Sequence, residues 1–266
     1  MRSYMIAMLA TTVMATPSAI DAQSHDTLPF TVGERLTYRV RVPKVGASGR
    51  GAMWIEGPVD VRGVGTYLLR FDMTAGFGPF KGVDRTQSWL DRDRMLSLRY
   101  EKRESHPFSR HEEEVELFPE QRWWEAGEAG SGDSATDAPL DELSFLYFLR
   151  TLSFESDTTL EFSRHFDTER NPTTVRVVGR EAITTKAGTF ATVVLEMRVR
   201  DPRRYKGDGV IRIHLTDDQC RLPVRIESAM PVLGTTVLTL ESHTHAPDHC
   251  ATRATEAAPK PASANP

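Results

Sequence analysis

The densest group of potential metal ligands lies near the C-terminal end of the chain, at His243, His245, Asp248, His249 and Cys250. Positions 243 and 245 share one face of an expected strand, so their imidazoles can reach the same ion. Imidazole is a preferred ligand of Zn²⁺ and Cu²⁺, which makes the three histidines candidate metal ligands. The alternative is a solvated polar strand end, with Cys250 used in a disulfide.

The chain contains two cysteines, Cys220 and Cys250. If 222–229 and 234–245 form a hairpin, the end of the second strand returns beside the start of the first. Cys250 then emerges near the turn 217–221, and an oxidising compartment favours a bond between the two thiols. The pattern predicts a Cys220–Cys250 disulfide, and the alternative is two free thiols.

Residues for nucleophilic or acid–base catalysis are present but follow no catalytic motif. The sequence has no Gly-x-Ser-x-Gly elbow, phosphate-binding loop or dinucleotide fingerprint. Asp217 and Asp218 resemble an acid pair, but adjacent side chains at a turn point apart and aspartate is a common turn former. We therefore expect a protein that is not an enzyme and that uses no cofactor.

Large apolar rings offer the most functional promise. Phe77 and Phe80 lie in a connection rich in Gly and Pro, 75–82. An exposed pair of apolar rings at such a place indicates an interaction site. We expect them to form a lip over an apolar pocket, with Trp89 and Tyr147 as further pocket residues. The alternative is that these rings fill the core.

One segment, 141–150, is apolar on every side, whether its residues are arranged with the period of a helix or of a strand. A helix with no polar face must be enclosed, so we predict a buried helix over about 140–152. Asp141 and Arg150 stand at its two ends, and buried charges need partners. We expect both to anchor the helix to the rest of the fold.

Nearly everything around this helix alternates apolar and polar residues, as strands with one dry face do. The clearest strands are centred on 35–42, 67–74, 193–200, 211–216 and 224–227. Less regular strands are expected near 50–57, 83–91, 95–104, 109–118, 158–166, 173–181 and 234–245. Turn residues separate them by about ten positions, the spacing of an antiparallel meander. The predicted fold is therefore mainly β, a curved antiparallel sheet or open half-barrel wrapped around one buried helix.

The first 22 residues have the features of a signal peptide. Arg2 precedes an apolar run over 5–15 that is too short to span a bilayer, and Ala22 provides a small residue for cleavage. We expect a periplasmic or secreted protein with no transmembrane span. Residues 23–246 are expected to form a single domain, with 126–139 as a surface loop, and 247–266 a disordered tail rich in Ala and Pro.

The formal net charge of −4 is mildly negative. This argues against nucleic acid and against an anionic membrane surface as the main partner, because proteins that bind either one present strongly basic surfaces.

Four segments in series resemble the DUF3108 family of exported bacterial proteins. They are Phe-x-Val-Gly-Glu-x-Leu-x-Tyr (30–38), Asp-x-Leu-Ser-x-x-Tyr-x-x-Arg (141–150), Ala-Gly-Thr-Phe (187–190) and Leu-Thr-Asp-Asp-x-x-Arg-Leu-Pro-Val (215–224). The resemblance covers about residues 28–245. It implies a β-rich periplasmic domain related to the open, helix-plugged half-barrel of LolA/LolB-type lipoprotein carriers, and it brings no catalytic residues.

Two functions from different classes remain open. The protein is either a non-catalytic carrier that binds a lipid or other apolar molecule between sheet and helix, or a structural or protein-interaction module of the cell envelope. A connected apolar cavity of a few hundred Å³ would favour the carrier. A tightly packed interior would favour the module.

Overall fold

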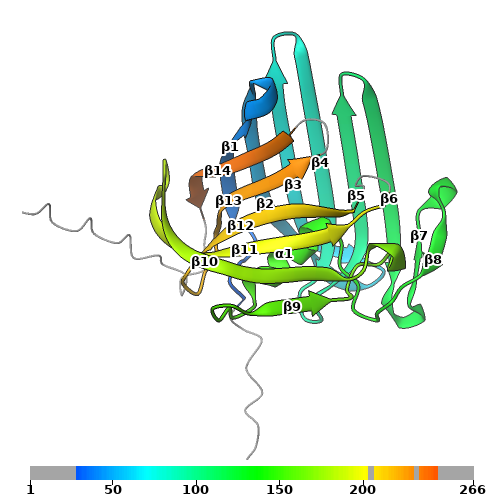
Figure 1. Ribbon diagram of the computed structural model, residues 1–266. Helices are drawn as coiled ribbons and strands as arrows, with labels where there is room; N and C mark the ends of the chain where they lie inside the picture. Colours follow the sequence, from blue (N-terminus) through cyan, green and yellow to red (C-terminus); the bar gives the residue numbers. More distant parts are fainter. Residues whose placement is uncertain (1–27, 203–206, 231–233, 245–266) are drawn as a thin grey trace, which may run out of the picture.

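A computed structural model describes residues 28–202, 207–230 and 234–244 (Figure 1). Strands dominate and form one antiparallel sheet of 14 strands. The strands are β1 Arg35–Val42, β2 Ala47–Val61, β3 Val64–Phe77, β4 Phe80–Asp91, β5 Leu96–His106, β6 Ser109–Phe118, β7 Trp123–Glu125, β8 Ser131–Asp133, β9 Thr159–Phe162, β10 Thr173–Thr185, β11 Gly188–Arg200, β12 Asp208–Thr216, β13 Pro223–Met230 and β14 Gly234–Thr244. The helices are α1 Glu142–Arg150 and the 3-10 turns η1 Pro43–Val45, η2 Pro119–Gln121, η3 Gly127–Ala129 and η4 Thr168–Arg170.

The strand order is a meander that is interrupted at one place. It runs from β8 back to β1, continues from β1 to β14, and then runs from β14 back to β9. The two edge strands β8 and β9 are therefore neighbours in sequence, and the chain passes from one edge to the other through α1. The sheet curls so that β10–β13 lie across from the long strands β3–β6, with α1 between them (Figure 1). The predicted fold class is confirmed.

Alternating burial along the strands explains why the sheet has a dry inner face. In β1 the side chains of Leu36, Tyr38, Val40 and Val42 are buried, whereas the residues between them are exposed or half-buried. Because successive strand residues point to opposite faces, one apolar stripe per strand supplies the inner wall. The main core cluster joins these stripes to α1.

The start of α1 is fixed by a fully satisfied buried aspartate. Asp141 Oδ1 accepts from the backbone N–H groups of Leu143 and Ser144, and Ser144 Oγ accepts in return from the Asp141 N–H. The other oxygen, Oδ2, accepts from the hydroxyls of Ser88 on β4 (2.5 Å) and Ser97 on β5 (2.7 Å). This capping box therefore begins the helix and also attaches it to the sheet.

The end of α1 is held by a buried ion pair. Arg150 donates two hydrogen bonds to the Glu34 carboxylate, at 2.6 and 2.8 Å. The guanidinium also donates to the carbonyl oxygens of Pro29 (2.7 Å) and Cys220 (3.2 Å). The predicted anchoring role of Asp141 and Arg150 is confirmed, because both ends of the helix are bonded to distant parts of the chain.

Two local predictions need correction. The segment 126–139 was expected to be a surface loop throughout, but 131–133 form β8, which pairs with β7. The strand expected over 158–166 ends at Phe162. The residues after Phe162 are not part of the strand, and His165 forms an isolated parallel bridge with Leu140, just before α1.

The expected signal peptide (1–22) and C-terminal tail (247–266) lie outside the described residues. Within the described part of the chain, no helix is long and apolar enough to cross a membrane.

Candidate functional site

A pocket of about 220 Å³ lies between the inner face of the sheet and α1. One of its walls is apolar and is supplied by β2, β3 and β11–β14, including Phe71, Met73 and Ile213. Leu143 and Leu146 of the helix complete this wall. An unfilled apolar concavity on the inside of a curved sheet is a typical place for a ligand.

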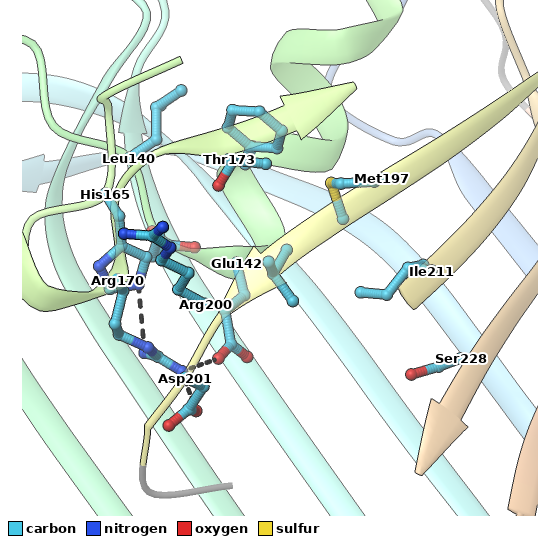
Figure 2. Close-up of a pocket in the computed structure, with 13 residues that line it drawn as sticks. Leu140, Glu142, His165, Arg170, Thr173, Met197, Arg200, Asp201, Ile211 and Ser228 are labelled. Atoms are coloured by element: carbon cyan, nitrogen blue, oxygen red, sulfur yellow. Dashed lines mark hydrogen bonds and ion pairs between the residues drawn. The ribbon is translucent and has the colours of Figure 1, made fainter. Parts of the chain in front are cut away.

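A second pocket, of about 190 Å³, lies at the N-terminal end of α1 beside β10–β12 (Figure 2). Both pockets are lined by Glu142, Met197, Ile211 and Ser228, so they adjoin along a common boundary. We call the two together the inner groove. Each half is smaller than a typical small-molecule site of about 300–1,000 Å³, so a ligand of that size would need both halves.

Another part of the groove wall carries charge. β4 and β5 supply Asp84, Lys102 and Glu104 to the groove, and α1 supplies Glu142. Lys102 donates to Glu142 at 2.7 Å and lies 3.6 Å from Glu104. The groove is therefore amphipathic, with an apolar side and a side of paired charges.

Arg170 of η4 organises the charged end of the groove. Its guanidinium donates to Glu142 (2.8 Å) and to Asp201 (2.5 Å), and Figure 2 shows the three side chains converging. Burial lowers the pKa of Arg170, but the carboxylates of Glu142 and Asp201 outweigh it, so the pKa lies above its ordinary value. Arg170 therefore stays charged and holds the helix N-terminus against the loop that follows β11.

His165 stays neutral beside this arginine. Its Nδ1 accepts from the Asp167 N–H at 3.0 Å, and its Nε2 lies 3.1 Å from Arg170 Nη1. Burial first, and the Arg170 charge second, lower the pKa of His165 to about 3. A neutral imidazole at physiological pH adds no charge to the groove.

Asp84 of the polar wall pairs with His106 of β5, and its Oδ1 lies 2.6 Å from the His106 Nε2. Burial raises the pKa of Asp84, although the neighbouring His106 partly opposes the shift.

The four predicted pocket residues are not brought together. Tyr147 is buried in the main core, where its ring packs edge-on against Phe30 at 5.1 Å between centroids. Trp89 belongs to a separate cluster with Leu68 and Leu98. Neither lines the inner groove.

Phe77 and Phe80 lie at the tip of the β3–β4 hairpin, opposite each other in register, and both are exposed. They do not line the groove either. A role for these two rings in ligand binding stays a prediction.

The predicted metal and disulfide residues fall largely outside the described chain. His243 is half-buried on β14, opposite Leu36 of β1. His245, His249 and Cys250 lie outside the described residues. Among those that are described, no group of three or more His, Cys, Asp or Glu is placed to hold a metal ion. Cys220 is buried, and its pairing with Cys250 remains untested.

Sequence reasoning missed the charged wall of the groove. Asp84, Lys102 and Arg170 look like ordinary surface charges on irregular strands and loops, and only strand pairing shows that they face inward. The apolar wall had a signal, because Phe71, Met73, Met197, Ile211 and Ile213 belong to the alternating stripes. Alternation identifies the inner face, but it does not tell which part of that face is left unfilled.

Comparisons with known proteins agree with the fold. A family model described as "Protein of unknown function (DUF3108)" matches residues 27–241. Among solved structures, a β-barrel-like protein of the domain of unknown function DUF1849 from Brucella abortus has a TM-score of 0.54 at 12% identity, over 79% of this chain and 96% of that one. At that identity the likeness concerns the fold alone.

Two further structures come from Parabacteroides distasonis (11% identity) and from Bacteroides fragilis (12% identity), the second described as having a YmcC-like fold. Each covers 82% of this chain, and 99% and 98% of their own chains are matched. Their TM-scores of 0.30 are too low to support any argument. None of the curated proteins compared with the chain matches it.

Proposed function

The chain belongs to the DUF3108 family of proteins of unknown function, and from its inner groove we propose that it is an exported, non-catalytic protein that binds a lipid or similar amphiphile. The ligand's apolar part lies along Phe71, Met73, Ile211 and Ile213. Its polar part meets the charged wall. Export is inferred from the signal-peptide pattern of residues 1–22.

The observation that carries this proposal is the unfilled apolar wall. A protein whose interior served only for stability would fill such a space with side chains, because interiors pack as densely as organic crystals. Here Phe71, Met73 and Ile211 line the groove and are only half-buried, so no side chain covers them completely.

The charged wall supports a binding role rather than catalysis. Glu142 is held by both Lys102 and Arg170. A carboxylate paired on two sides is a poor general base, since its lone pairs are already occupied by donors. Such a wall can orient a polar head group through hydrogen bonds.

The expected affinity is moderate. Burying about eight methylene groups contributes roughly 6 kcal/mol at ~0.8 kcal/mol each, which corresponds to a dissociation constant between about 1 μM and 1 mM. Weak to moderate affinity suits a carrier, which must also release its ligand.

The first experiment is native mass spectrometry of protein purified from the periplasm, followed by titration of delipidated protein with N-phenyl-1-naphthylamine. We expect a retained lipid-sized mass and saturable binding of the probe. Ile211→Asn should weaken probe binding at least about tenfold, because Ile211 lines both parts of the groove.

The matched control is Val210→Asn. Val210 precedes Ile211 on β12, is also half-buried, and points to the opposite face of the sheet. Its substitution should leave probe affinity unchanged. Absence of both lipid mass and saturable binding, or equal effects of the two substitutions, would reject the carrier in favour of the envelope module.

A further inference from the structure

Exposed apolar side chains gather at one end of the molecule. Among the described residues, Val45 (40% exposed), Phe77 (62%), Phe80 (50%) and Phe108 (91%) stand at the tips of the β1–β2, β3–β4 and β5–β6 connections. Figure 1 shows these three tips side by side at the same end of the sheet. We call the four residues the tip patch.

The members of the tip patch are neighbours in space. Phe77 and Phe80 oppose each other in the β3–β4 ladder. The centroids of the Phe80 and Phe108 rings are 5.9 Å apart, and a Cβ placed on Gly46 would lie 3.8 Å from the Phe77 ring. The patch therefore bridges all three tips.

Folding does not account for these rings. Hairpin tips ordinarily carry polar turn residues, and a contiguous exposed apolar patch marks an interaction site. The tips of β3–β4 and β5–β6 share a Pro-Phe pair, Pro79-Phe80 and Pro107-Phe108.

The charge around the patch is positive, in contrast to the net charge of −4 for the chain. The three tip segments, 43–48, 76–82 and 105–111, contain Lys44, Lys81 and Arg110 but no aspartate or glutamate. Lys81 and Arg110 are exposed. Glu104 and Glu112 flank the segment 105–111 on the side away from its tip. The excess of positive charge is therefore limited to the hairpin ends.

We propose that the tip patch docks the protein on a lipid bilayer that contains anionic phospholipids. Phe77, Phe80 and Phe108 enter the headgroup region, and Lys81 and Arg110 meet the phosphates. This combination of apolar rings and flanking cations is what binds peripheral proteins to anionic membranes.

The size and shape of the patch favour a bilayer over a protein partner. A stable protein interface buries about 800 Å² on each side, whereas this patch is a row of four side chains on narrow hairpin ends. A bilayer surface is fluid and has no fixed shape that must be complementary, so several separate hairpin tips can insert into it. Charge complementarity then selects anionic lipid.

The patch is also continuous with the inner groove. Phe77 and Ala75 continue the inner-face stripe of Phe71 and Met73, which line the groove. Docking would therefore place the open end of this stripe at the membrane. The proposal does not depend on ligand binding in the groove, because the docking test uses delipidated protein.

The test is flotation of the mature protein with vesicles of phosphatidylcholine alone and of phosphatidylcholine mixed with phosphatidylglycerol. We expect binding to the mixed vesicles that weakens as salt is added, and much weaker binding to phosphatidylcholine alone. The triple change Phe77→Ser, Phe80→Ser and Phe108→Ser should lower vesicle affinity at least about tenfold.

Two controls distinguish docking through the tip patch from misfolding and from non-specific hydrophobic adsorption to vesicles. Trp123→Ser removes an exposed ring on β7, outside the tip patch, and should leave flotation unchanged. Lys81→Glu with Arg110→Glu should abolish the preference for phosphatidylglycerol. All variants should keep the wild-type melting temperature.

The proposal is overturned if the wild-type protein does not float with mixed vesicles. It is also overturned if the triple variant floats with them to the same extent as the wild-type protein. Self-association or capture of a protein through the patch without vesicle binding would also overturn it. If vesicle binding is seen without any probe binding in the groove, docking stands and the carrier function falls.

Discussion

Arg150 and Glu34 form an ion pair whose side chains are each only 1% exposed. Glu34 lies in the first of the four segments that resemble the family, Arg150 in the second, and the carbonyl oxygen of Cys220 in the fourth accepts from the same guanidinium. Tyr38 adds a bond from its hydroxyl to the Pro223 carbonyl at 2.9 Å. Residues from three of these segments therefore meet at the end of α1, where Glu34 and the Cys220 carbonyl hold Arg150.

This pair leads to a prediction about stability. Arg150→Met leaves the Glu34 carboxylate buried without its partner, so the free energy of unfolding should fall by about 3–5 kcal/mol. Urea denaturation measures the loss. Arg39→Met, which breaks the more exposed Arg39–Glu241 pair, should cost less than about 1 kcal/mol.

The double variant Glu34→Leu with Arg150→Met separates the charge effect from packing. With no buried charge left unpaired, it should recover part of the stability lost by Arg150→Met. Equal losses for Arg39→Met and Arg150→Met would contradict the argument.

Helix α1 lies at the interruption of the sheet, between edge strands β8 and β9 in the sequence. One of its sides packs into the core, where Leu149 is completely buried, and another side carries Leu146 at the groove. The helix therefore fills part of the core and also forms one wall of the inner groove.

These two leucines provide a matched comparison on the same helix. Leu149→Ala creates a sealed cavity and should cost about 3–5 kcal/mol, whereas Leu146→Ala only widens the groove and should cost about 2 kcal/mol. Thermal or urea denaturation gives both values. A larger loss for Leu146→Ala would mean that the groove side of the helix is packed like the core.

Among the secondary-structure elements, the strands that bury one face against the core were predicted from the sequence. The alternation over 35–42 and 211–216 predicted β1 and most of β12 because the inner residues of both strands face the same apolar core and groove. It failed at β7 and β8, which have three residues each, too few for a period to be seen. The helix was recognised because no polar face remained in 141–150.

The candidate site was less predictable than the fold. Phe77 and Phe80 stand out in the sequence as rings in a connection rich in Gly and Pro, but neither ring reveals that Phe108 on the next hairpin lies beside them. The groove depends on which inner side chains fail to meet across the curved sheet. That information is not contained in any local pattern.

The two halves of the sheet are joined by strands from opposite ends of the described chain. β1 pairs with β14 in the middle of the sheet, and the inner faces of both halves share one core cluster with α1. Neither β1–β8 nor β9–β14 can bury its inner face alone. The molecule should therefore behave as one cooperative unit.

Unfolding should follow a single transition by two probes. All four tryptophans lie between residues 54 and 124, so their fluorescence reports on β1–β8, whereas far-UV circular dichroism reports on every strand. We expect the two thermal midpoints to coincide. A second transition in circular dichroism without a change in fluorescence would show that β9–β14 unfold separately.

The sequence by itself determined the β-rich class, the enclosed helix and the identity of the inner-facing stripes, because these follow from periodicity over neighbouring residues. Only the tertiary structure decided that the stripes leave a groove, that Arg170, Glu142 and Lys102 form its charged wall, and that three hairpin tips carry their exposed rings to one end. Those features arise from the register and curvature of strands that are far apart in the chain. Whether two such side chains come into contact depends on the register of every strand pair that lies between them in the sheet.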